Sequence, residues 1–319
     1  MVTRRIVQHG SSSLTITLPA KWVKDNHLKK GNEITIVEEG QYLMIGGRGK
    51  KEVEEKTVTI KDGKIPPVAI MHYIAALYRA GYDKVEFTYD AAEVYKAIEH
   101  VTGTDLNGWD IIESKKNSCT VESISTTEQA QFKNVLSKLL YNLLELSKES
   151  LSGIKDKNTK TIEMSQTKES VINRSANFCE RVLIKAGHEN PDKIPFLFYI
   201  IKELENIGDE YNDICNYYLK TKKIHPKTIK LYEETNDILS GFKRFYEKRE
   251  VEKALSFEEA SIFYGKVLET TDRVFSLLDA NQEDGRILHH LLSILRRTKS
   301  CLGCLFSIMI VEENKEISD

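Results

Sequence analysis

Apolar residues recur at helical spacing along the chain from about Thr127 onward. Within the segment 194–220 they step by four and three positions alternately, as one face of an α-helix requires. These positions are Ile200, Leu204, Ile207, Tyr211, Ile214 and Tyr218. A matching series lies 91 residues later, at Leu291, Leu295, Thr298, Leu302, Leu305 and Met309. Two amphipathic segments precede each series, so the pattern predicts two copies of a three-helix unit, 127–222 and 226–313.

Residues 1–47 alternate apolar and polar positions and therefore predict short strands. The segment 13–18 places Leu14, Ile16 and Leu18 on one face, and Pro19 ends that strand. A short helix is expected after the proline, followed by a hairpin whose turn lies in Glu-Glu-Gly. A module of about 45 residues buries little core and exposes strand edges, so two copies are expected to interleave.

Between these regions the pattern is mixed. Residues 48–57 are charged and poor in apolar side chains, which is typical of a linker. Residues 58–125 alternate strand and helix patterns and predict a small α+β domain. Breakers are expected in the loops between the C-terminal helices, at Gly153, at Gly187 with Pro191, and at His225-Pro226. The expected fold is thus multidomain and mainly α-helical.

The charge is unevenly distributed. Residues 1–50 hold eight Lys and Arg against four acids, a net charge of +4, whereas the whole chain carries −2. A basic module on an acidic body favours contact with nucleic acid. No apolar run approaches the roughly 20 residues of a transmembrane helix, and the first residues lack the apolar core of an export signal. Five dispersed cysteines are typical of reduced thiols, so a cytoplasmic protein without membrane insertion is expected.

Residues 14–45, LTITLPAKWVKDNHLKKGNEITIVEEGQYLMI, resemble the SpoVT/AbrB swapped-hairpin DNA-binding domain. The resemblance implies a homodimer that binds DNA through basic residues on its first strand and around its short helix. By position these are Arg4, Arg5, Lys21 and Lys24. Adjacent strand residues face opposite ways, so only one of the two arginines is expected to face DNA. In place of the basic residue that many family members carry before the Ile/Leu-Pro strand, this chain has hydroxyl residues, which can also bond phosphate: Ser11, Ser12, Ser13 and Thr15.

The string LENIGDEYNDI at 204–214 resembles the signature of PhoU proteins, whose bundles bind multinuclear iron or zinc clusters. Glu205, Asp209 and Asp213 follow one another at intervals of four and so share one helical stripe. Like charges at that spacing repel one another, and a bound cation would relieve the repulsion. The stripe also lies roughly opposite the apolar positions, where solvated charges belong in any helix.

The second repeat argues against a metal cluster. At an offset of 91 residues the three acids align with Arg296, Ser300 and Cys304. We therefore expect no required cofactor and at most a weakly held iron or zinc ion. Cys301-x-x-Cys304 has no second cysteine pair, and the adjacent His289 and His290 diverge on their helix. No nucleophile–base arrangement or phosphate-binding glycine loop is found, so no enzyme is expected.

The order of the modules resembles that of archaeal PhoU-like phosphate-uptake regulators. That resemblance implies a transcriptional regulator that binds DNA and senses phosphate status through its helical bundles, with a phosphate transporter or signalling protein as a further partner. Two alternatives remain open. One is an adaptor that regulates a phosphate transporter and does not bind DNA, and the other is a metal-binding helical bundle. Resemblance of fold does not by itself decide among them.

Overall fold

A computed structural model describes residues 3–10, 13–39, 42–47, 55–60, 66–125, 129–252, 256–280 and 284–316. The chain divides into two compact units, Met1–Val53 and Glu54–Asp319. The described residues include no helix that is both long and apolar enough to cross a membrane. The second unit is mainly helical and also holds a four-stranded sheet.

The N-terminal unit contains two antiparallel strand pairs and one short helix. Strands β1 (Val7–His9) and β2 (Ser13–Thr15) pair with each other, helix α1 spans Ala20–Asp25, and β3 (Ile34–Glu39) pairs with β4 (Tyr42–Gly47). Pro19 precedes the first turn of α1, where its missing amide proton costs nothing. The first two strands are shorter than the alternation predicts, and residues 16–18 lie outside β2.

Among the residues of this unit whose burial the structure describes, none is buried. Six of its large apolar side chains are exposed: Ile6, Val7, Leu14, Ile16, Ile36 and Leu43. In the β3–β4 hairpin Ile36 lies opposite Ile45, and Leu43 lies two residues before Ile45, so the three share one face. A single copy therefore leaves the apolar face of its hairpin uncovered.

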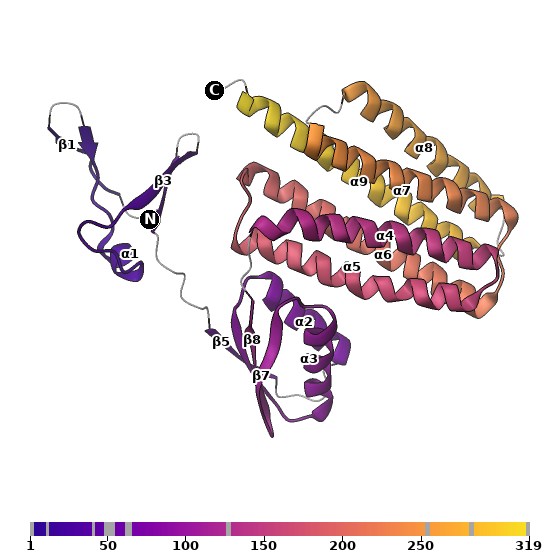
Figure 1. The fold of residues 1–319 in the computed structure, drawn as a ribbon, viewed down its shortest axis with the longest axis horizontal. Coiled ribbons are helices and arrows are strands. Elements are labelled where there is room, and N and C mark those ends of the chain that lie inside the picture. The colour runs from indigo at the N-terminus through magenta and orange to yellow at the C-terminus, as the bar shows by residue number, and fades with distance from the viewer. Residues whose placement is uncertain are drawn as a thin grey trace. The chain divides into compact units, whose positions relative to one another are not determined.

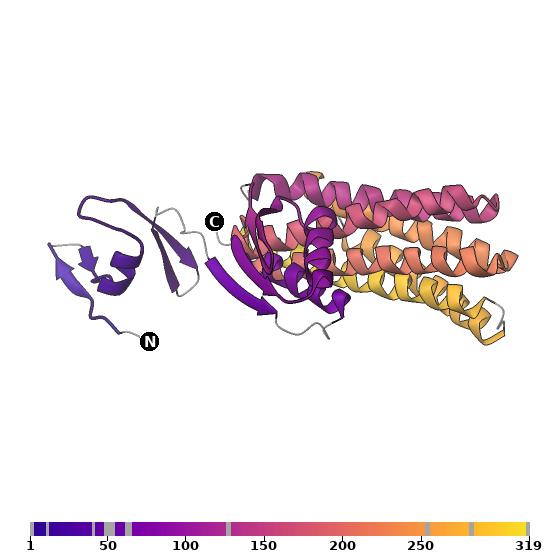
Figure 2. The same ribbon diagram turned by 90° about the horizontal axis from the view of Figure 1, so that it is seen from below.

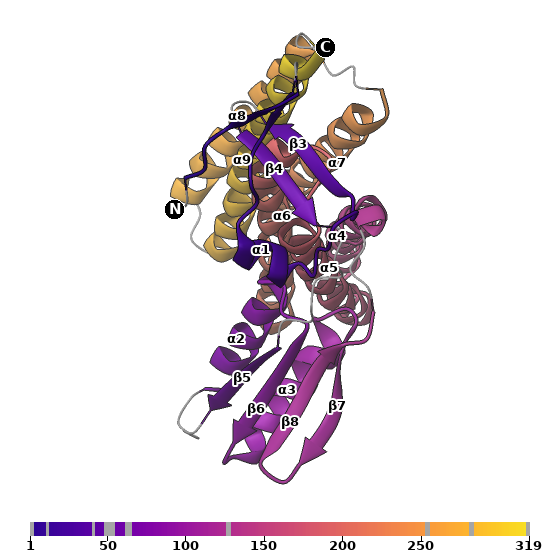
Figure 3. The same ribbon diagram turned by 90° about the vertical axis from the view of Figure 1, so that its left-hand side faces the viewer.

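The second unit begins with an α/β domain. Its elements are β5 (Glu55–Ile60), α2 (Pro67–Arg79), β6 (Lys84–Tyr89), α3 (Ala92–Thr104), β7 (Trp109–Lys115) and β8 (Ser118–Ser123). Figure 3 shows the strands side by side in the order β5-β6-β8-β7, with β5 parallel to β6. Alternate residues of β6, namely Val85, Phe87 and Tyr89, are buried in one core with α2 and α3. β5 begins at Glu55, inside the segment predicted as a linker.

Helices α4 to α9 follow: α4 (Phe132–Lys155), α5 (Thr159–Lys185), α6 (Ile194–Thr221), α7 (Pro226–Glu252), α8 (Phe257–Ala280) and α9 (Gly285–Glu316). Helices α4, α5 and α6 pack together, as do α7, α8 and α9, and the two groups meet through α6 with α9 and α4 with α7 (Figure 1). Figure 2 shows these helices running lengthwise beside one another. α9 begins 91 residues after α6, which is the offset of the two apolar series.

The apolar series are buried as helical spacing predicts, except at Met309, which is half-buried. From Ile200 to Tyr218 every predicted position is at most 2% exposed, and Leu291 to Leu305 are at most 1% exposed. The expected break at Gly153 is wrong, because Gly153 lies inside α4. A β-carbon there would lie 2.6 Å from Cγ1 of Ile162 and 3.1 Å from its backbone nitrogen. Gly153 thus permits α4 and the first turns of α5 to approach closely.

Candidate nucleic-acid interface

The four predicted DNA-binding residues are all exposed in the N-terminal unit. Arg4 and Arg5 lie before β1 rather than within a strand. The alternation of side chains along a strand therefore does not apply to them, and the two arginines need not face opposite ways. Lys21 and Lys24 lie three positions apart on α1 and so share one side of that helix. Among the described residues none of the four forms an ion pair with a carboxylate, which leaves their charges available to an anion.

Local hydrogen bonds fix the end of α1. The side-chain amide of Asn26 donates to the carbonyl of Trp22 at 2.9 Å, and the amide of Leu28 donates to the carbonyl of Val23 at 3.0 Å. His27 has a φ of 52°, in the left-handed region that reverses the chain direction after a helix. These bonds hold the short helix in place, so Lys21 and Lys24 project from an ordered support.

The hydroxyl side chains of strand β2 have a structural role. Thr15 donates its hydroxyl to the carbonyl of Val7 at 3.2 Å, and Ser13 donates to the carbonyl of His9. Both bonds cross the β1–β2 pair and so bind the hydroxyls to the hairpin itself. Ser11 and Ser12, the other two hydroxyl residues of this segment, lie outside the described residues.

A comparison with models of known protein families found a match in the N-terminal unit. Residues 7–54 match the family model described as antidote-toxin recognition MazE, bacterial antitoxin. The N-terminal module is similar to the MazE antitoxin domain. The match begins at β1 and takes in α1 and both strands of the β3–β4 hairpin. Searches of curated proteins and of solved structures found no match to the chain.

The acidic stripe lies on α6. Glu205 is half-buried and pairs with Lys202, whereas Asp209 and Asp213 are exposed. Desolvation raises the pKa of Asp209 to about 7, and the like charges of Glu205 and Glu169 act in the same direction. Because the side chain is exposed, water screens part of this effect. Among the described residues no group of three or more His, Cys, Asp or Glu side chains is placed to hold a metal ion.

The positions of the second repeat that align with the acidic stripe are Arg296, Ser300 and Cys304. Arg296 is exposed, with its guanidinium carbon 5.2 Å from the ring centroid of Phe275 on α8. Ser300 and Cys304 are half-buried. Burial raises the pKa of Cys301 well above its usual value, so this thiol stays protonated and unreactive. The Cys301 and Cys304 pair is therefore a packing feature of α9.

A polar network between α6 and α9 was not predicted. Glu210 accepts hydrogen bonds from Nδ1 of His290 at 2.7 Å and from the hydroxyl of Ser293 at 2.5 Å. Arg297 donates to Glu203 at 2.9 Å and also reaches Glu210 at 3.4 Å. Burial acts to raise the pKa of Glu210, but the hydrogen bonds from His290 and Ser293 hold it below its usual value. The network joins the two helical groups through charged side chains.

Proposed function

We propose that the protein is a DNA-binding transcriptional regulator. The observation that carries the proposal is a set of exposed cations, free of carboxylate partners among the described residues, on a module similar to the MazE antitoxin domain. Lys21 and Lys24 lie on one side of α1, and Arg4 and Arg5 lie just before β1. Such side chains contact phosphate oxygens, which supply most of the affinity of sequence-independent binding and make it depend on salt.

The helical part supports a regulatory role connected with phosphate uptake. Its two three-helix groups and the string LENIGDEYNDI resemble PhoU proteins, and the order of modules resembles archaeal phosphate-uptake regulators. In this proposal the protein acts in the cytoplasm, and its bundles take their signal from a phosphate transporter or a signalling protein. Exposed helical faces of this kind suit the docking of another helix. Any metal at Asp209 and Asp213 would be a single weakly held ion.

The test is DNA binding measured over a range of salt concentrations. Replacing Lys21 and Lys24 together by alanine should weaken binding to all sequences and reduce the salt slope by about one unit for each phosphate that the variant no longer neutralises. The matched control replaces Lys160 and Lys230, exposed residues of α5 and α7, by alanine. The control removes the same charge from outside the module, so its affinity should change little.

An unchanged affinity and slope in the Lys21 and Lys24 variant would contradict a DNA contact at α1. The second candidate would then be favoured, in which the protein is an adaptor for a phosphate transporter and the N-terminal module only dimerises. The exposed apolar face of the β3–β4 hairpin is the observation behind that alternative. A protein of that kind would bind DNA no more tightly than a variant without the basic residues.

A further inference from the structure

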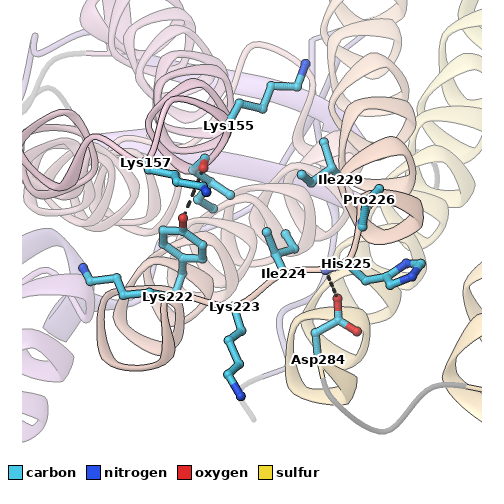
Figure 4. A pocket seen from close by; sticks show the side chains of 11 residues that line it. Lys155, Lys157, Lys222, Lys223, Ile224, His225, Pro226, Ile229 and Asp284 are labelled. Atoms are coloured by element: carbon cyan, nitrogen blue, oxygen red, sulfur yellow. Dashed lines mark hydrogen bonds between the residues drawn. The ribbon is translucent and has the colours of Figure 1, made fainter.

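A pocket of about 340 Å³ opens at the end of the bundle where α4 turns into α5 and α6 turns into α7. Figure 4 shows side chains from both turns around it, together with Asp284 from the start of α9. Its ionisable lining is strongly basic: Lys155, Lys157, Lys222, Lys223 and His225, against the one carboxylate of Asp284. None of these residues belongs to the N-terminal module or to the acidic stripe of α6.

Several of the ionisable groups already have partners, and Lys222 itself lies with its ammonium 5.9 Å from the ring centroid of Tyr218. Lys155 pairs with Glu233 on α7. Asp284 is 1% exposed and accepts a hydrogen bond from the backbone amide of His225 at 2.9 Å. In contrast, Lys157, Lys222 and Lys223 are exposed and form no ion pair with any carboxylate that the structure describes. These lysines leave positive charge at the pocket without a carboxylate to neutralise it, and a bound anion would supply the missing negative charge.

Lysines at helix ends have an ordinary explanation, because they complement the negative end of the helix dipole. The helix dipole does not explain why lysine occupies two positions with an unfavourable backbone conformation. Lys157 and Lys222 have φ angles of 52° and 54°, in the left-handed region where glycine is favoured. A glycine would end each helix without strain. Instead both positions carry lysine, and both border the same pocket.

One side of the pocket is apolar. Tyr218 is 2% exposed and donates its hydroxyl to the carbonyl of Ile154 at 3.2 Å, which fixes the ring. Ile224 and Ile229 complete this side. A pocket of this size with an apolar wall and a cationic rim suits a small organic anion better than a bare ion. Lysine, a compact charge with three donors, is a common partner of phosphoryl oxygens.

We propose that this pocket binds a small phosphorylated anion, with its phosphoryl groups among Lys157, Lys222 and Lys223. All its lining residues belong to the helical part of the second unit, and the proposal goes beyond the proposed function because it concerns a small ligand rather than DNA or a partner protein. Binding to the full-length protein in the absence of DNA therefore tests it independently.

The experiment is calorimetric titration of the full-length protein with pyrophosphate, ADP and, as a non-phosphoryl anion, sulfate. Replacing Lys157 and Lys222 together by glycine removes two charges and suits the left-handed backbone, so the fold is retained. Binding of pyrophosphate or ADP should weaken at least tenfold. The control replaces Lys160 and Lys230, which do not line the pocket, by glutamine and should bind as the unchanged protein does.

Each result decides for or against the site. ADP binding more tightly than pyrophosphate supports it and places the organic part against Tyr218 and Ile224. Equal affinities also support it, with the phosphoryl groups making the contacts alone. Three results overturn it: no saturable binding of either ligand, sulfate binding as tightly as pyrophosphate, or an equal loss in the glycine variant and its control.

Discussion

The guanidinium of Arg181 on α5 lies 2.8 Å from the carboxylate of Asp83 in the α/β domain. Arg181 is 1% exposed, and it also donates to the carbonyls of Tyr78 at 2.6 Å and Tyr82 at 2.8 Å. Its charge lies 4.7 Å from the ring centroid of Tyr78. Lys185, one turn further along α5, bonds the same carboxylate. The buried charge of Arg181 is thus one of the contacts that fasten the sheet domain to the helical bundle.

Replacing Asp83 by asparagine should lower the free energy of unfolding of the second unit by about 3 kcal/mol, because a buried guanidinium then loses its counter-charge. Urea unfolding followed by circular dichroism measures the change. Asp237→Asn, at an exposed position of α7, is the matched control and should shift the free energy by less than about 0.5 kcal/mol. Equal effects of the two substitutions would show that the ion pair contributes nothing specific.

Two helical glycines should respond to alanine with opposite signs. Alanine at an exposed helical site is favoured over glycine by about 1 kcal/mol. Gly303 on α9 is exposed and has no neighbouring atom within 4 Å of an added β-carbon, so Gly303→Ala should stabilise the protein by about that amount. At Gly153 the same β-carbon meets Ile162, including its backbone, so Gly153→Ala should destabilise the protein despite the better helix propensity. Thermal unfolding of the pair provides the measurement, and a shift in the same direction for both would contradict close packing at Gly153.

The sequence predicted the fold correctly where a repeated pattern of residues is compatible with only one type of secondary structure. Apolar spacing located α6 and α9, because a run of buried positions at helical intervals cannot be satisfied by a strand. The sequence predicted the ends of the helices less accurately than their positions. Glycine commonly ends a helix, and Gly153 was therefore predicted to lie in a loop. In the structure its lack of a side chain allows α4 and α5 to pack closely instead. Strand β5 begins at Glu55 within a charged segment, because pairing with β6 outweighs the weak strand propensity of its charged residues.

The sites were harder to predict because their parts are far apart in the chain. The acidic stripe of α6 could be predicted because its three carboxylates follow one another at intervals of four residues in the sequence. Glu210 and His290 are 80 residues apart, and Arg181 and Asp83 are 98 apart, so no local spacing connects either pair. The lysine pocket likewise joins two turns that only the packing of α4 against α6 and α7 brings together. Helix faces can be predicted from local sequence, whereas partners across a core depend on the tertiary fold.

The carboxyl group of Asp209 should make stability depend on pH. Its pKa is raised from 3.8 to about 7 in the folded protein, first by desolvation and then by Glu205 and Glu169. The folded state therefore holds more protons than the unfolded state between those values, and stability falls as pH rises through that window. Asp209→Asn removes the cost of the charge and should stabilise the protein at pH 8. The gain should be only about 1 kcal/mol, because the side chain is exposed and screened.

Denaturation curves at pH 4 and pH 8 test this expectation. The stabilising effect of Asp209→Asn should be present at pH 8 and small at pH 4, where the carboxyl group of the folded protein is already protonated. Asp272→Asn, at an exposed position of α8, controls for the loss of one negative charge and should show no such difference. An identical gain at both pH values would mean that Asp209 is not the titrating group.

The apolar face of the β3–β4 hairpin should be the contact between two copies of the chain. Ile36 is 56% exposed and Leu43 is 59% exposed, and together they would bury an apolar patch in a dimer. Because burial of each large aliphatic side chain contributes about 1.5–3 kcal/mol, removing two of them should dissociate the dimer at micromolar concentration. We therefore expect light scattering to give a dimer for the unchanged protein and a monomer for Ile36→Ser with Leu43→Ser.

Thr35 offers the matched control, because it lies on the opposite face of the same strand. Thr35→Ser alters an exposed β-branched residue without touching the apolar face and should leave the dimer intact. If both variants remain dimeric, the copies must associate through other surfaces, such as the helical bundle. If only the Ile36 and Leu43 variant dissociates, its DNA affinity should fall as well, since each copy would then contact phosphates without its partner. That joint decrease separates a dimer that serves DNA binding from one that serves only stability.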